Sequence, residues 1–183
     1  NDINHLLHRE PQSAALHFEK GTICLRSHDT ICALNSFAKS TEYDSQNPAN
    51  WSALGLVQLM MNNPDEAFIS LSKSINHGSN WAGDYINRGI IHYQRHNYRG
   101  ALADYDKAVS IAPQDDQCYY NRGVLRQELG DYNRALEDFT QAITFAPERV
   151  EVYYQRGMVL LQLRQWQEAA SIPSVPAPRL LSW

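Results

Sequence analysis

Small and aromatic residues recur along this chain at a constant step, with polar stretches between them. Glycine stands every 34 residues, at Gly21, Gly55, Gly89, Gly123 and Gly157. Alanine keeps the same step, at Ala33, Ala67, Ala101, Ala135 and Ala169. An aromatic residue or histidine precedes each glycine by four positions, at His17, Trp51, Tyr85, Tyr119 and Tyr153. A fixed period of this length indicates a repeat architecture, in which each unit buries its apolar face against its neighbours.

Each unit is predicted to form two antiparallel helices joined by a short turn. Turn-forming residues separate the two halves of successive units, at 27–29, 62–65, 96–98 and 130–132. The glycine falls in the first helix, where it lowers helix propensity by about 1 kcal/mol, and the alanine falls in the second. We expect this pair of small residues to let the two backbones approach closely. The pattern therefore predicts an all-α chain.

Two further sets of positions complete the signature. A large apolar residue follows the alanine by four positions, at Phe37, Leu71, Tyr105 and Phe139, and proline closes two units, at Pro113 and Pro147. With the 34-residue step, these residues resemble the tetratricopeptide repeat. The resemblance extends from about residue 14 to 172. It implies a right-handed α-solenoid of stacked helix-turn-helix units that binds other proteins and has no active site of its own.

The period divides the chain into seven segments. Residues 1–13 are expected to be the end of a preceding repeat or a capping helix, and the fifth repeat is incomplete because Pro173 interrupts its second helix. The tail after it contains Pro176 and Pro178 and is expected to be extended. The repeats are predicted at 14–47, 48–81, 82–115, 116–149 and 150–172, and the tail at 173–183.

Composition narrows the classes of function. The formal net charge of −4 argues against a nucleic-acid partner, which requires a basic surface. No apolar run is long enough for membrane insertion, and no signal segment is visible, so a cytoplasmic location is expected. The three cysteines, Cys24, Cys32 and Cys118, lack paired spacing and favour free thiols in a reducing compartment.

Motifs for catalysis, metals and cofactors are weak. His92 and His96 have a metal-compatible spacing of four, but no glutamate follows the first, and a structural role is favoured. No phosphate loop, nucleophile elbow or carboxylate pair occurs. We therefore expect no enzyme activity, no metal and no cofactor.

Arginine replaces the usual leucine before three of the repeated glycines, at Arg88, Arg122 and Arg156. Asp104 and Asp138 follow the first two of these arginines by sixteen residues, on the second helix of the same unit. We expect an ion pair between each arginine and its aspartate. Arg156 would meet Ile172 instead and would lack such a partner.

The first helices are expected to line a concave groove. Asn87 and Asn121 recur there, and an asparagine amide can both donate to and accept from a peptide backbone. Apolar and aromatic residues share this face, which is typical of a partner site, although they could instead belong to the core between repeats. The predicted contact residues are Ile86, Asn87, Tyr93, Tyr120, Asn121, Val124 and Tyr154.

The leading hypothesis is a non-catalytic scaffold or adaptor that binds an extended peptide or a helix of a partner protein in this groove. The groove lacks the lysines with which some tetratricopeptide repeats clamp a terminal carboxylate, so that class of ligand is not expected. Two alternatives remain: a structural subunit that uses its convex face and ends, and the targeting arm of an enzyme. Leu180, Leu181 and Trp183 have no place in the repeat pattern and could mediate self-association.

Overall fold

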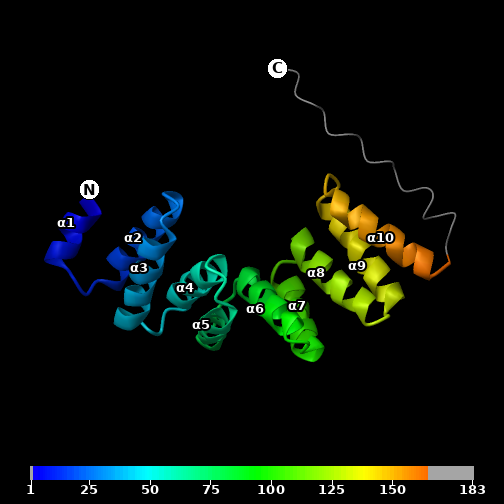
Figure 1. Ribbon diagram of the computed structural model, residues 1–183, viewed down its shortest axis with the longest axis horizontal. Helices are drawn as coiled ribbons and strands as arrows, with labels where there is room; N and C mark the ends of the chain where they lie inside the picture. The colour runs from blue at the N-terminus through cyan, green and yellow to red at the C-terminus, as the bar shows by residue number, and fades with distance from the viewer. Residues whose placement is uncertain (1, 165–183) are drawn as a thin grey trace, which may run out of the picture. The chain divides into compact units, whose positions relative to one another are not determined.

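Helices account for all the regular structure in the described residues, 2–164, of the computed structural model, which contain no strand (Figure 1). The predicted all-α helical-repeat fold is confirmed. The second helix expected for the fifth repeat and the tail at 173–183 lie outside the described residues. The helices are α1 (Asp2–Arg9), α2 (Ala14–Arg26), α3 (Thr30–Tyr43), α4 (Pro48–Met60), α5 (Pro64–Asn76), α6 (Ala82–Gln94), α7 (Tyr98–Ile111), α8 (Asp116–Glu128), α9 (Tyr132–Phe145) and α10 (Val150–Gln162).

The chain divides into two compact units, with the boundary between Asp104 and Tyr105 inside α7. In the first unit, α2 packs against α3, α3 against α4, α4 against α5, and α5 against α6. In the second unit, α8 packs against α9, and α9 against α10. Each unit thus consists of helices that contact their neighbours in sequence, as expected of a helical repeat.

The turn inside each repeat depends on one residue in the left-handed region. Positive φ values recur at the 34-residue step, at His28 (58°), Asn62 (60°), His96 (56°), Gly130 (78°) and Arg164 (61°). The next amide then bonds back across the helix end, as in Asp29 N to Cys24 O at 2.9 Å and Asp131 N to Arg126 O at 2.9 Å. These bonds satisfy carbonyls at the helix end and reverse the chain.

The repeated glycine makes room for a large side chain. A Cβ atom added at Gly21 would lie 2.7 Å from the ring of Phe37, and one added at Gly123 would lie 2.9 Å from the ring of Phe139. The atoms nearest to such a Cβ belong to the aromatic residue four positions after the repeated alanine. Ala33 and Ala135 are fully buried in the clusters built around Phe37 and Phe139, and the rings take the space beside the glycines.

Two of the cysteines are not free, which corrects the prediction from their spacing. Cys24 near the end of α2 and Cys32 near the start of α3 form a disulfide, with their Cα atoms 5.7 Å apart. The turn between the two helices brings the residues together, and this Cα separation is normal for a disulfide. Cys118 is a free cysteine and is fully buried in α8.

Candidate protein-binding surface

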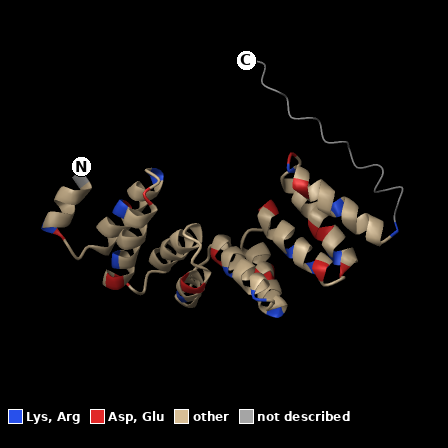
Figure 2. Ribbon diagram, viewed as in Figure 1, with Lys and Arg blue, Asp and Glu red and all other residues tan. Residues whose placement is uncertain are grey.

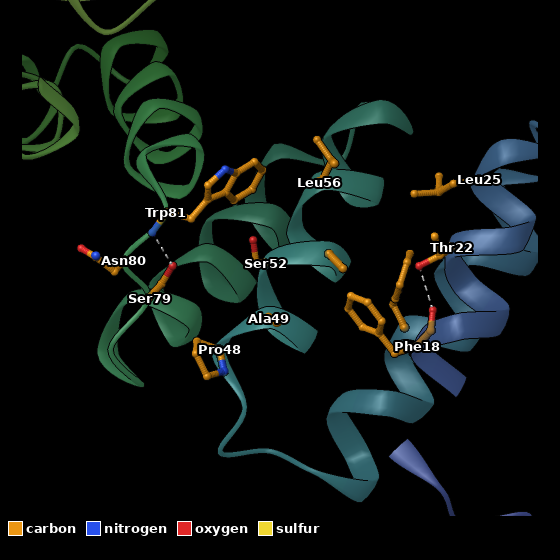
Figure 3. A pocket seen from close by; sticks show the side chains of 12 residues that line it. Phe18, Thr22, Leu25, Pro48, Ala49, Ser52, Leu56, Ser79, Asn80 and Trp81 are labelled. Carbon is orange, nitrogen blue, oxygen red and sulfur yellow. Dashed lines mark hydrogen bonds between the residues drawn. The ribbon is translucent and has the colours of Figure 1, made fainter. Parts of the chain in front are cut away.

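A hollow of about 560 Å³ lies on the first unit, between α2, α4 and the start of α6 (Figure 3). Its size falls within the range of small-ligand pockets. None of its lining residues is charged. They are Phe18, Thr22, Leu25, Phe37, Pro48, Ala49, Ser52, Ala53, Leu56, Ser79, Asn80 and Trp81.

Small side chains on α4 create the hollow. Ala49, Ser52 and Ala53 line it at positions where α8, at the same step of the repeat, carries the larger Gln117, Tyr120 and Asn121. Large side chains stand on both sides: in Figure 3, Phe18 extends from α2, and Trp81 extends from the start of α6 toward Leu56. Helix α4 also contains no charged residue, and its whole ribbon is uncoloured in Figure 2. The hollow is therefore a gap in an otherwise bulky face.

A buried carboxylate lies behind the floor of the hollow. Asp84 on α6 has no exposed surface, and it accepts hydrogen bonds of 2.6 Å from each of the hydroxyls of Ser52, Ser74 and Ser79. A buried carboxylate needs such donors because burial removes its hydration. Ser52 and Ser79 also line the hollow, so their hydroxyl hydrogens are directed away from it and toward Asp84.

The predicted contact residues on α6 differ in accessibility. Ile86 is only 6% exposed and belongs to the core of the first unit. Asn87 and Tyr93 are partly buried, and the ring of Tyr93 lies 5.9 Å from that of Tyr98. Asn87 is therefore more available to a partner than its neighbour Ile86.

The remaining predicted contact residues belong to the second unit. Tyr120 packs against Phe139, with ring centroids 6.2 Å apart, and the guanidinium of Arg149 lies 4.3 Å from its ring centre. The side-chain amide of Asn121 donates to the carbonyl of Gln117 at 2.9 Å. The side chain of Tyr154 on α10 is 67% exposed.

Val124 is the only predicted contact residue at a second, smaller hollow in the described residues. This depression of about 270 Å³ is otherwise lined by polar and aromatic side chains. The other lining residues are Gln127, Glu128, Tyr132, Gln155 and Gln162.

Comparisons with known proteins agree with this architecture. Residues 117–149 match the family model described as tetratricopeptide repeat, and residues 89–130 match a second model described as TPR repeat. The chain belongs to the tetratricopeptide-repeat superfamily. No curated protein matches it significantly in sequence.

Solved structures of tetratricopeptide-repeat proteins share this fold. YrrB, described as a TPR protein with an unusual peptide-binding site, has a TM-score of 0.82 and 16% identity, over 94% of this chain and 89% of its own. MamA from Desulfovibrio magneticus RS-1 has a TM-score of 0.76 and 19% identity, over 86% and 89%. A tetratricopeptide repeat protein from Parabacteroides merdae has a TM-score of 0.73 and 22% identity, over 88% and 64%.

The predicted ion pairs are present in this tetratricopeptide-repeat chain. Arg88 donates to both oxygens of Asp104, at 2.9 and 2.7 Å. Hydrogen bonding to Asp104 raises the pKa of Arg88 and outweighs the effect of burial. Asp138 accepts from Arg122 at 2.7 Å and also from Arg126 at 2.8 Å. These side chains are engaged within the repeats, which supports the structural role expected for them.

Arg156 differs from the other two arginines. Its Nε atom is buried and has no hydrogen-bond partner within residues 2–164. The position that would face it by the repeat spacing, Ile172, lies outside the described residues.

Sequence reasoning missed the hollow on the first unit and the residues that shape it. The available signal was the set of small residues on α4, together with Trp81 at the position where the other repeats have Asn47, Asp115 and Arg149.

Within residues 2–164, no three His, Cys, Asp or Glu side chains form a group that could hold a metal ion. None of the helices described is long and apolar enough to cross a membrane.

Proposed function

We propose that this chain is a non-catalytic scaffold or adaptor that binds a segment of another protein on the face made by its first helices. The observation that carries the proposal is the uncharged hollow between α2, α4 and α6, since contiguous apolar surface of this kind is usually a binding surface. The tetratricopeptide-repeat family in general serves protein interaction. YrrB, which shares the fold, is described as having a peptide-binding site.

The ligand is an extended peptide or a helix. Asn87 and Asn121 provide amides for its backbone, while Tyr93, Tyr120 and Tyr154 provide aromatic surface for its side chains. Tyr154 is the most accessible of these aromatic residues, at 67% exposed. Ile86 supports this face from the core, and Val124 adds apolar surface on α8.

The test compares matched variants of the full chain against a captured partner. Tyr120→Ala combined with Asn121→Ala removes two side chains from the first-helix face. Glu137→Ala combined with Gln141→Ala removes two exposed side chains from the second helix of the same repeat. We expect the first pair to abolish partner binding and the second pair to leave it unchanged, with the same far-ultraviolet circular dichroism for both. The reverse result would refute the proposal.

A structural role in a larger assembly is the second candidate. It is supported by two exposed apolar side chains on second helices, Ile31 at 65% and Ile69 at 56%. Self-association through Leu180, Leu181 and Trp183 would also fit this role, and those residues lie outside the described part of the chain. Loss of partner binding on Ile31→Ser or Ile69→Ser, with no effect of the Tyr120 and Asn121 pair, would favour this candidate.

A further inference from the structure

Trp81 occupies a position that normally caps a helix. At the equivalent positions of other repeats, Asn47 accepts from the amide of Ala49 at 3.0 Å, and Asp115 accepts from the amide of Gln117 at 3.0 Å. Trp81 makes no side-chain cap bond, so α6 begins without one. Such a cap bond stabilises the start of a helix because it satisfies one of its free amides. A tryptophan at this position therefore weakens the helix start, and it is also 50% exposed.

Two neighbouring residues are adapted to the indole. A Cβ atom added at Gly83 would lie only 2.7 Å from the six-membered ring of Trp81, so a glycine here gives the ring its place. The equivalent residues of the flanking repeats, Ala49 and Gln117, both carry a Cβ. The hydroxyl of Ser79 accepts from the amide of Trp81 at 3.3 Å and donates to Asp84. Gly83 thus leaves room for the indole, and Ser79 fixes the backbone from which it extends.

The hydroxyl groups of the hollow offer acceptors and no donors. Thr22 donates to the carbonyl of Phe18, and Ser52 and Ser79 donate to the carboxylate of Asp84. Each hydroxyl hydrogen is therefore already used, because a carbonyl or carboxylate oxygen can only accept. Each hydroxyl oxygen also has two lone pairs, so Ser52 can still accept, and Ser79 keeps one lone pair beside the one that faces the amide of Trp81.

An anionic side chain fits this hollow poorly. It would meet no hydroxyl donor and no basic lining residue, because the only other donors there, the amide of Asn80 and the indole of Trp81, are neutral. The buried carboxylate of Asp84 also lies behind Ser52 and Ser79 on the floor. A large aromatic side chain with an N–H or O–H group fits well. Its ring would pack between Phe18 and Trp81 over Ala49 and Ala53, and its polar hydrogen could reach an acceptor oxygen.

We infer that this hollow is the anchor site for a tryptophan or tyrosine side chain of the partner segment, and that it rejects an acidic residue at the same place. This inference rests on the proposed function and specifies its ligand. The amide of Asn80, on the rim, is placed to bind the backbone beside the anchor. Trp81 is then a specificity-determining residue of the interaction.

The test uses the full chain and single-residue probes whose acetyl and amide groups imitate a peptide backbone. N-acetyl-tryptophanamide, N-acetyl-leucinamide and N-acetyl-glutamic acid amide are titrated to about 10 mM, a range that detects binding free energies near −3 kcal/mol. Binding is followed by ligand-observed nuclear magnetic resonance. We expect the tryptophan probe to bind about tenfold more tightly than the glutamate probe. No binding of the tryptophan probe, or equal binding of the glutamate probe, overturns the inference.

Variants of the lining residues test whether the tryptophan probe binds in the hollow. Trp81→Asn removes one wall and supplies a cap residue, and Ala53→Phe fills the floor. Each variant is expected to weaken binding of the tryptophan probe at least about tenfold. Leu129→Ala, which removes an apolar side chain of similar exposure (49%) outside the hollow, should have no effect. Unchanged binding in both hollow variants overturns the inference.

A double variant, Tyr120→Ala with Asn121→Ala, separates the two proposals. If it abolishes capture of the partner while Trp81→Asn and Ala53→Phe do not weaken the tryptophan probe, the proposed function stands without this anchor. If it leaves partner capture intact and the hollow variants still weaken binding of the tryptophan probe, the anchor site is supported. The partner-binding surface is then centred on α4 and does not include Tyr120 and Asn121.

Discussion

The guanidinium of Arg122 in α8 binds the carboxylate of Asp138 in α9, with Nη2 donating to Oδ1 at 2.7 Å. Asp138 is almost fully buried, at 2% exposed. Burial raises the pKa of Asp138, although Arg122 and Arg126 both lower it. The two arginines therefore offset the desolvation of this carboxylate only in part.

Replacing Arg122 alone should be more harmful than replacing the pair. Arg122→Leu leaves Asp138 with Arg126 as its remaining partner, and we expect a loss of about 1–3 kcal/mol in the free energy of unfolding. Asp138→Leu made together with Arg122→Leu removes the buried charge and should recover part of that loss. Urea denaturation of the double-mutant cycle measures the coupling. Additive effects would show that the two side chains do not stabilise each other.

The sequence predicted this pair because its spacing of sixteen residues recurs in two repeats, at Arg88 and Asp104 and at Arg122 and Asp138. It did not predict that Asp138 would also bind Arg126, at 2.8 Å, or that Arg122 would also bind Asp106, at 2.8 Å. These two contacts depend on how long side chains are oriented across helices, which the repeat period does not determine. Periodicity thus indicates which helices meet, while individual polar contacts require coordinates.

Gly123 is predicted to be intolerant of larger residues. A Cβ there would lie 2.9 Å from Cε1 of Phe139 and 3.2 Å from Cβ of Asp138, so Gly123→Leu must displace the core of the second unit. We expect a loss of about 1–3 kcal/mol or more, measured by thermal or urea unfolding. Gln141→Leu, at an exposed position on α9, should change stability by less than about 0.5 kcal/mol. Equal losses for the two variants would contradict the packing role of the glycine.

The disulfide predicts how many cysteines of the unfolded chain react with a thiol reagent. Because Cys24 and Cys32 are bonded, the chain purified without reductant and then unfolded should react with a thiol reagent at one cysteine, Cys118. The native chain should react slowly at that residue because it is fully buried. Prior reduction should raise the count to three. Three reactive thiols in the unreduced, unfolded chain would show that the bond is absent.

Cys118 should also make stability depend on pH in the alkaline range. Burial, aided by Asp115 and Asp116, raises the pKa of its thiol from 9.0 to about 11 in the folded chain. As the pH rises, the unfolded chain loses this proton before the folded chain does. The contribution of the thiol to the free energy of unfolding is therefore complete below pH 9 and decreases as the pH rises toward 11. The loss over this window is at most about 2–3 kcal/mol. Comparison with Cys118→Ala isolates it: the parent should lose more stability than the variant between about pH 8 and 10.5, and parallel curves would contradict the assignment.

The hollow on the first unit could not be located from the sequence, for a physical reason. Ala49 and Ala53 are ordinary residues of a helix, and only the bulk of Phe18 and Trp81 on neighbouring helices turns them into a depression. Asp84 was equally hidden, since one of its hydroxyl partners, Ser52, is thirty-two residues away. The glycine and alanine steps predicted the helix pairs, but a binding surface depends on the differences between repeats rather than on what they share.

Trp81→Asn should separate stability from binding. Asparagine at this position can cap α6 as Asn47 caps α4, which contributes about 0.5–2 kcal/mol and offsets the lost contact of the half-exposed indole with Gly83. We therefore expect the free energy of unfolding to stay within about 1 kcal/mol of the parent. Trp81→Ala, which restores no cap, should be less stable than Trp81→Asn, and both should bind the tryptophan probe weakly. Chemical unfolding measures stability, and the probe titration measures binding. A loss of more than about 2 kcal/mol in Trp81→Asn would mean that the indole serves the fold rather than a partner.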